Sequence, residues 1–223
     1  SHSGGLVMKK GKFLKKAALI AAGALTVISL ANLSLNKVDA AKKPARTSVS
    51  KKVAKPKAKS KLIANKKTSL VVYFSVSGNT AKVARQIASY TGAKTSRIRS
   101  EQAYPTEYNQ TVARGENELK NNIHPTIRGR IANWNKYKTI YLGFPTWWMQ
   151  PPMIIHTLFD NYSFRGKTIV PFTTSMETPM SSSMPYIRKM AKSKNAKRVI
   201  NGFRYDNNNA ELISYLRRNK LIR

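Results

Sequence analysis

Residues 73–80 read YFSVSGNT and join two segments of different character. Residues 69–72, SLVV, are mostly apolar, and residues 81–88, AKVARQIA, place apolar side chains on one face of a helix. The stretch therefore predicts a strand, a hydroxyl-rich loop with one glycine, and a helix that begins where the loop ends.

Short apolar runs rich in β-branched and aromatic residues recur along the chain, as is typical of strands buried on both faces of a parallel sheet. They cover residues 139–144, 168–173 and 198–200, with a weaker run at 94–99. Helical patterns lie between or after them, near 108–119, 153–159, 182–191 and 210–216. This alternation predicts an α/β fold: a doubly wound, five-stranded parallel sheet in the order 2-1-3-4-5, with helices on both faces.

The charge is strongly positive and unevenly distributed. The 223 residues contain 41 Lys and Arg against 9 Asp and Glu, a formal net charge of +32, and no cysteine. The predicted folded domain, residues 68–223, holds 24 of the basic and 8 of the acidic residues, so its charge is about +16. Without cysteine its stability depends on packing and not on disulfides.

The first 40 residues predict export. Residues 1–7 precede Met8, and we set them aside as an expression remnant or a misplaced start. Residues 8–40 have a basic beginning, the apolar stretch AALIAAGALTVISL and the small-residue ending VDA, which is typical of a cleaved signal peptide. An uncleaved membrane anchor is the alternative, although the apolar stretch is short for one. We expect an extracellular or envelope-associated protein.

Residues 41–67 predict a disordered linker rich in Lys, Ala and Pro. They contain eleven Lys and Arg, no acidic residue and no apolar periodicity, so they bury too little surface to offset the entropy of ordering. Two interpretations stay open: an inert spacer, or a polycation arm that binds an anionic envelope polymer or membrane surface.

The loop in YFSVSGNT has the chemistry of a phosphate cradle. Ser75, Ser77 and Thr80 supply hydroxyls, Gly78 permits a positive φ, and the helix that starts at Asn79 offers free N–H groups to an anion. We expect no cationic side chain inside this cradle. The loop is neither a GxxxxGK[ST] motif nor a three-glycine dinucleotide fingerprint, so a phosphate monoester fits best. A plain N-capped turn is the alternative.

Two further loops end predicted strands at the same edge of the sheet. Residues 143–152, GFPTWWMQPP, contain two adjacent tryptophans, which predict a wall against a flat aromatic ligand; the alternative is that one of them packs inside. Residues 173–178, TTSMET, end the next strand and would face the other two loops. A phosphate site, an aromatic wall and a polar loop together describe a flavin mononucleotide (FMN) pocket.

Four ordered stretches carry a resemblance to a known family: YFSVSGNT, YPTEYN at 104–109, YLGFPTWW at 141–148 and FRGKTIVPFTTS at 164–175. Over roughly residues 69–204 the chain resembles the flavodoxins, in particular the bacterial branch with a paired Trp in the ring loop. The resemblance implies noncovalent FMN and one-electron transfer. It implies phosphate contacts from Ser75, Val76, Ser77, Gly78, Asn79 and Thr80, ring contacts from Pro145, Thr146, Trp147, Trp148 and Met149, and a far edge formed by Thr173, Thr174 and Ser175.

The chain departs from that branch at two places where glycine is usual. Met149 follows the paired Trp, and residues 176–180 read METPM in place of a glycine-rich stretch. Glycine would allow the backbone to approach the ring closely, so the departures bear on ring binding and not on the phosphate loop.

Other functions find less support in the sequence. A catalytic triad would bring His124 or His156 near Asp160 or Asp206, but no nucleophile elbow is present. No metal-ligand spacing or nucleic-acid recognition motif occurs. We therefore expect an exported FMN-dependent electron carrier with an unknown redox partner, or the flavin domain of a small NAD(P)H:quinone reductase. The alternative is a cationic envelope-binding protein on a flavodoxin fold that has lost its cofactor.

Overall fold

The computed structural model describes residues 64–223. The predicted signal peptide and residues 41–63 of the predicted linker lie outside the described residues. Residues 64–67 of that linker belong to the fold, because Lys66–Thr68 form a short 3-10 helix, η1. Asn65 Oδ1 accepts the N–H of Lys67 at 2.9 Å, and Ser69 Oγ donates to the carbonyl of Asn65 at 2.6 Å. The second of these bonds connects the end of the predicted linker to Ser69.

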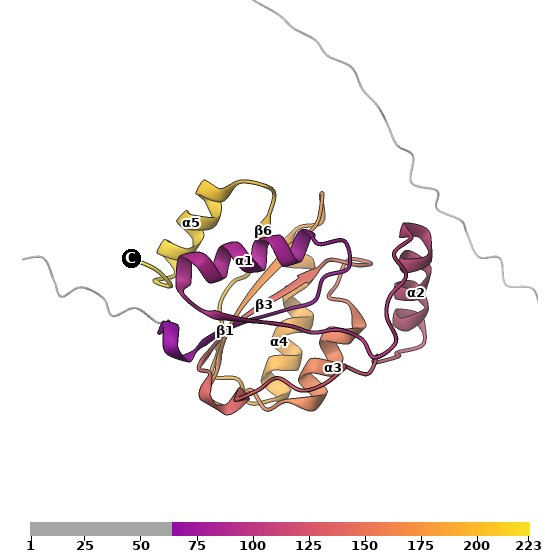
Figure 1. The fold of residues 1–223 in the computed structure, drawn as a ribbon, viewed down its shortest axis with the longest axis horizontal. Helices are drawn as coiled ribbons and strands as arrows, with labels where there is room; N and C mark the ends of the chain where they lie inside the picture. The colour runs from indigo at the N-terminus through magenta and orange to yellow at the C-terminus, as the bar shows by residue number, and fades with distance from the viewer. Residues whose placement is uncertain (1–63) are drawn as a thin grey trace, which may run out of the picture. The chain divides into compact units, whose positions relative to one another are not determined.

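Strands and helices alternate along the chain (Figure 1). The strands are β1 (Ser69–Tyr73), β2 (Lys94–Arg97), β3 (Thr139–Pro145), β4 (Thr168–Thr174), β5 (Arg198–Val199) and β6 (Phe203–Tyr205). The α-helices are α1 (Asn79–Thr91), α2 (Tyr108–Lys120), α3 (Met153–Asn161), α4 (Met184–Ser193) and α5 (Asn209–Arg218). Two further 3-10 helices are η2 (Trp134–Lys136) and η3 (Met180–Ser182).

All strand pairs in the sheet are parallel, and the order β2-β1-β3-β4-β5 confirms the predicted topology. The chain reverses its direction of winding between β1 and β3, which lie side by side. A doubly wound sheet binds ligands at this switch point, beyond the carboxyl ends of the strands.

The fifth position of the sheet is divided, whereas the sequence predicted one strand there. Both β5 and β6 pair with β4, and Ile200–Gly202 lie between them, opposite Val170 and Pro171. The N–H of Ile200 donates to the carbonyl of Ile169 at 2.9 Å. Along a strand, residues two apart direct their N–H and C=O groups towards the same neighbouring strand. Pro171 therefore faces β5 and β6 as Ile169 does, but it has no N–H to donate. The interruption follows from that missing donor.

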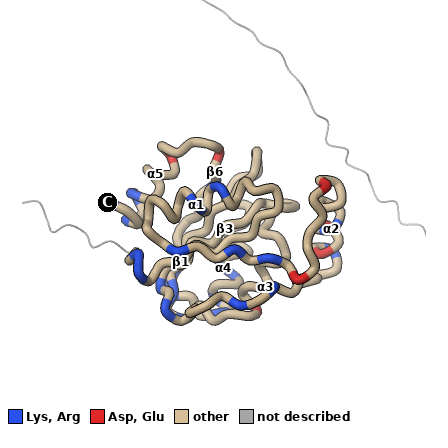
Figure 2. Tube along the Cα trace, viewed as in Figure 1, with Lys and Arg blue, Asp and Glu red and all other residues tan. Residues whose placement is uncertain are grey.

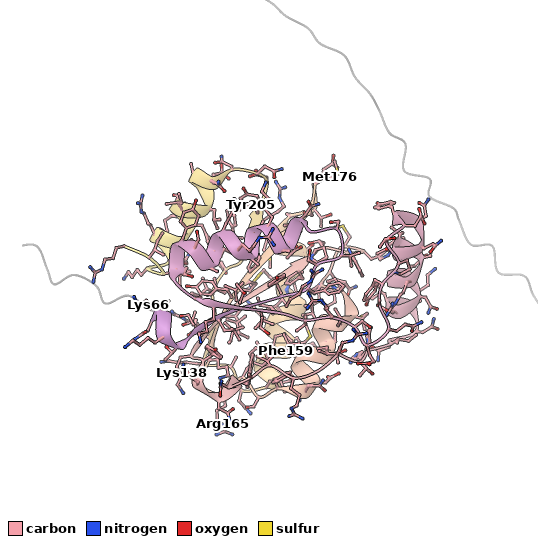
Figure 3. All side chains as sticks on the ribbon, viewed as in Figure 1. Lys66, Lys138, Phe159, Arg165, Met176 and Tyr205 are labelled. Carbon is pink, nitrogen blue, oxygen red and sulfur yellow. The ribbon has the colours of Figure 1, made fainter. Side chains whose placement is uncertain are left out.

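Each face of the sheet has its own apolar core. Along β1, Val71 belongs to the cluster with α1 and α5, whereas Leu70 and Val72 belong to the cluster with α3 and α4. Figure 1 shows these two helix pairs on opposite sides of the sheet, which confirms that helices cover both faces. The labelled Phe159 lies within the core on the α3–α4 side (Figure 3).

Helix α2 is anchored by polar contacts more than by an apolar face. Tyr108, the first residue of the helix, is exposed, and only Gly115 and Glu118 are fully buried in the helix. Glu118 accepts hydrogen bonds from Arg114 Nε and from the hydroxyl of Tyr104, both at 2.7 Å.

No helix within residues 64–223 is long and apolar enough to cross a membrane.

Gly143 gives a test of the packing between β3 and β4. Gly143 and Phe172 are register partners, and a Cβ on Gly143 would lie 2.1 Å from the Phe172 ring. We expect Gly143→Ala to lower the free energy of unfolding by about 1–3 kcal/mol through overpacking. Denaturant titration measures this. In the double variant with Phe172→Leu the loss should be smaller than the sum of the two single losses; simple additivity would contradict the contact.

Candidate functional site

The loop after β1 leaves backbone donors of α1 unpaired. Gly78 is the N-cap of the helix, with φ 95° and no side-chain capping bond. Among the first four helical N–H groups, that of Ala81 donates to Ser75 Oγ at 3.2 Å and that of Lys82 to the carbonyl of Gly78 at 3.0 Å. Within the described chain, the N–H groups of Asn79 and Thr80 have no hydrogen-bond partner. Two free amides at the positive end of a helix dipole form an anion site.

The side chains of this loop differ in what they can offer. Ser77 and Asn79 are exposed, and Val76 is half-buried. Ser75 is buried and orients the loop by its bond to the helix. Thr80 is also buried, and its hydroxyl lies 2.7 Å from that of Thr174. The predicted phosphate residues therefore divide into exposed donors and buried supports.

A cation supports this loop from the neighbouring strand. Arg97, at the end of β2, donates through Nη2 to the carbonyl of Ser75 at 2.7 Å. The sequence gives no sign of this contact, because Arg97 is 22 residues away and the pairing of β2 with β1 brings it near.

The ring loop after β3 is a tight turn with two residues of positive φ. Trp147 and Gln150 exchange backbone hydrogen bonds of 3.0 and 3.1 Å across it. Between them, Trp148 has φ 50° and Met149 has φ 65°. Residues other than Gly, Asn and Asp rarely adopt this backbone conformation, which costs of order 1–3 kcal/mol per residue. Met149 thus occupies a glycine-type backbone position without being glycine.

The two tryptophans have different environments, so they do not form one continuous wall. Trp147 is half-buried and packs edge-on against Phe74 and Tyr104, with ring centroids 5.4 Å from each. Trp148 is 47% exposed and Met149 is 59% exposed. Trp147 therefore packs partly against the core, and Trp148 presents an exposed ring.

Threonine hydroxyls join the ends of β3 and β4. Thr173 is fully buried, and its hydroxyl donates to the carbonyl of Phe144 at 2.7 Å. The Thr146 hydroxyl lies 2.7 Å from that of Thr173, and the N–H of Thr146 donates to the carbonyl of Thr174. Thr173 is therefore a structural link between the strands, with no surface for a ligand.

The loop after β4 is held from β6. Arg204 donates through Nη1 to the carbonyls of Ser175 and Met176, both at 3.1 Å. Met176 is 95% exposed and projects from the fold (Figure 3). Ser175 Oγ donates to the carbonyl of Thr178 within the loop. Like the Arg97 contact, the Arg204 contact cannot be predicted from the sequence of the loop, because Arg204 lies on another strand.

All three predicted loops meet at the carboxyl-end edge of the sheet. The Thr80–Thr174 pair joins the first loop to the third. The Thr178 hydroxyl lies 3.9 Å from the sulfur of Met149, which joins the third loop to the second. Pro145 ends β3 beside Thr174. The structure thus brings the three sequence segments into one surface site.

A histidine–carboxylate pair lies elsewhere and lacks a nucleophile. His124 Nδ1 lies 2.5 Å from Asp160 Oδ2, and its Nε2 faces Asn122 Oδ1 at 3.3 Å. His156 packs 5.2 Å from the His124 ring, and burial lowers its pKa, with the neighbouring His124 adding to the effect. No hydroxyl in the described residues bonds either ring, so the pair does not make a triad.

Met149 gives a test of the turn. We expect Met149→Gly to change the free energy of unfolding little, within about 1 kcal/mol, because relief of strain offsets the larger entropy of the unfolded chain. Met149→Ile should be less stable than the glycine variant by about 1–3 kcal/mol, since a β-branched residue tolerates positive φ poorly. Thermal and denaturant unfolding measure both. Equal stabilities would show that the turn lacks positive φ in solution.

Comparison with known proteins agrees with this geometry. A family model described as flavodoxin matches residues 67–212. A solved candidate flavoprotein from Bacteroides eggerthii is 28% identical, with a TM-score of 0.60 over 67% of this chain and 96% of that one. One from Bacteroides uniformis is 25% identical, with a TM-score of 0.61 over 69% and 99%. A flavoprotein from Lactobacillus acidophilus, solved in complex with FMN, is 26% identical, with a TM-score of 0.54 over 67% and 98%. No curated protein matches the sequence. The chain belongs to the flavodoxin family.

Proposed function

We propose that this flavodoxin binds FMN noncovalently at the three loops and carries electrons through it. The unpaired N–H groups of Asn79 and Thr80 carry the proposal, because they form an anion site at the switch point of the sheet. The FMN complex of the Lactobacillus acidophilus flavoprotein supports the choice of cofactor. The flavin would supply the redox chemistry, and the protein would set its position and potential.

The residues of the site take separate roles in this proposal. Ser77, Gly78, Asn79 and Thr80 hold the phosphate, and Ser75 and Val76 shape the loop. Trp148 and Met149 offer surface to the ring, whereas Pro145, Thr146 and Trp147 position them. Thr174 and Ser175 form the far edge, and Thr173 links the strands beneath.

The conformation of Met149 argues against a flavodoxin fold that has lost its cofactor. That alternative depends on missing glycines near the ring. The backbone at Met149 nevertheless has the positive φ that glycine would provide, so the loop keeps its shape at a cost in strain. Proteins retain such strain where function requires the geometry.

Export and envelope binding remain part of the proposal on sequence grounds. They depend on residues 8–67, mostly outside the described residues. The basic character of the folded domain agrees with an anionic surrounding. Quinone reductase activity would add a hydride donor and a quinone to the same flavin.

The phosphate loop is tested by comparing FMN with riboflavin. Ser77→Ala removes an exposed hydroxyl beside the charged phosphate, and Thr80→Ala removes the buried hydroxyl that pairs with Thr174 and holds the loop in place. We expect each change to cost about 1.5–3 kcal/mol, or roughly one to two orders of magnitude in FMN affinity. Riboflavin affinity should stay nearly the same. Titration monitored by flavin fluorescence measures both.

The matched control is Ser89→Ala, at the exposed far end of the same helix, which should bind FMN like the parent protein. Thr80→Ser should retain most of the affinity, because it keeps the hydroxyl that meets Thr174. Equal losses for FMN and riboflavin would show that the loop does not hold the phosphate.

The positive charge of the domain should raise the midpoint potential of bound FMN. Two-electron reduction adds negative charge to the flavin. One positive charge about 10 Å away, in an effective dielectric near 40, stabilises the reduced flavin by roughly 0.8 kcal/mol. Added salt screens this field. We expect the potential to fall as salt rises in a redox titration. A potential that rises with salt would contradict the argument.

A further inference from the structure

A pocket opens at the same edge of the sheet as the three loops, on the β2 side of the phosphate loop. Its volume is about 180 Å³. Phe74, Ile98 and Tyr104 contribute apolar and aromatic walls, and Arg97, Arg99 and Arg128 contribute guanidinium groups. We call it the arginine pocket. Ser75 and Val76, which shape the phosphate loop, also line this pocket, and the FMN proposal assigns no role to its other residues.

The pocket is cationic without a neutralising partner inside it. None of the described residues that line it is Asp or Glu. Two acids adjoin it: the Glu118 carboxylate accepts from the Tyr104 hydroxyl at 2.7 Å and pairs with Arg114 outside the pocket. The Glu101 carboxylate lies 4.0 Å from Arg128 Nε with both side chains more than 60% exposed, so the Glu101–Arg128 pair is weak and screened. Arg97 Nε is buried and has no hydrogen-bond partner in the described chain. An unsatisfied buried donor of this kind calls for an acceptor.

The backbone sets the two exposed arginines in place. The N–H of Arg128 donates to the carbonyl of Arg99 at 2.8 Å, and Ser100 pairs with Ile127 in an antiparallel bridge. The segments that carry Arg99 and Arg128 are therefore held together before any ligand arrives. Figure 2 shows acidic residues mainly along α2 and near β6 and α5, with basic residues over the rest of the fold.

The aromatic wall is also formed in advance. Tyr104 donates to Glu118 at 2.7 Å, and the guanidinium carbon of Arg114 lies 3.7 Å from the centroid of its ring. Burial and the adjacent Glu118 raise the pKa of Tyr104 far above its ordinary range, so the phenol stays neutral. A wall held in one orientation saves the entropy that a mobile side chain would lose on binding.

Size and chemistry together define an occupant. An engineered apolar cavity of about 150 Å³ holds one benzene molecule, so this pocket has room for one aromatic ring. Guanidinium groups match the geometry of a carboxylate in two-point hydrogen bonds. We propose that the arginine pocket binds a single-ring aromatic carboxylate, with the ring against Phe74, Ile98 and Tyr104 and the carboxylate on the arginines.

Sodium benzoate titrated into the full-length protein without FMN tests the proposal, with benzamide as the neutral ligand of the same shape. Protein-observed NMR should show saturable shifts at Ile98, Ser100 and Tyr104 with benzoate. Benzamide should bind at least tenfold more weakly. Because FMN is absent, the result does not depend on whether the phosphate loop holds FMN.

Variants separate the pocket from general charge. Arg99→Gln and Arg128→Gln change exposed side chains and should each weaken benzoate binding at least tenfold. Arg165→Gln removes the same charge from an exposed site before β4, at the opposite edge of the sheet (Figure 3), and should bind benzoate like the parent protein.

Three results would overturn the proposal. Equal affinity for benzoate and benzamide would remove the role of the arginines. An equal loss in Arg165→Gln would mean that benzoate follows the net charge of the protein. Tighter binding of phenyl phosphate than of benzoate would reassign the pocket to a phosphate ester.

Discussion

The site depends on how α1 begins. A helix that starts on a serine or aspartate satisfies its own first amides, but α1 starts on Gly78 with φ 95°, and the amides of Asn79 and Thr80 stay unpaired. Because β1 lies between β2 and β3, these amides are at the point where the winding of the sheet reverses. One glycine conformation thus places a positive helix end where a doubly wound sheet leaves room for a ligand.

Hydroxyl pairs turn three separate loops into one site. The hydrogen-bond ladder of a parallel sheet ends where its strands end. The loops that follow the strands therefore need not contact one another. Here Thr80 meets Thr174, and Thr146 meets Thr173, both at 2.7 Å. Each pair joins loops from different strands, so movement of one loop is opposed by the next. The buried Thr173 shows that a hydroxyl in a predicted ligand loop can serve the scaffold instead.

The sequence predicts the parts of this protein that depend on local pattern. Apolar runs located the main strands, their alternation with helices gave the sheet order, and hydroxyl-rich turns located the three loops. It does not predict features that depend on the neighbouring strand. The break between β5 and β6 arises from the missing N–H of Pro171 on β4, and Arg97 and Arg204 reach their loops from other strands. Adjacent tryptophans look alike in a sequence, yet Phe74 and Tyr104 give Trp147 an inside position that Trp148 lacks.

The exposure of Met176 favours an electron carrier over an enzyme with an enclosed site. Met176 lies in the loop after β4, is 95% exposed and has no role against the flavin in the proposal. It therefore presents an apolar side chain next to the site to an approaching protein, and methionine packs adaptably against different partners. A reductase that orients a small quinone gains from a closed, water-excluding cavity, whereas a carrier needs its redox group near the surface so that a partner can approach it. The geometry therefore weighs the proposal towards exchange of electrons with another protein.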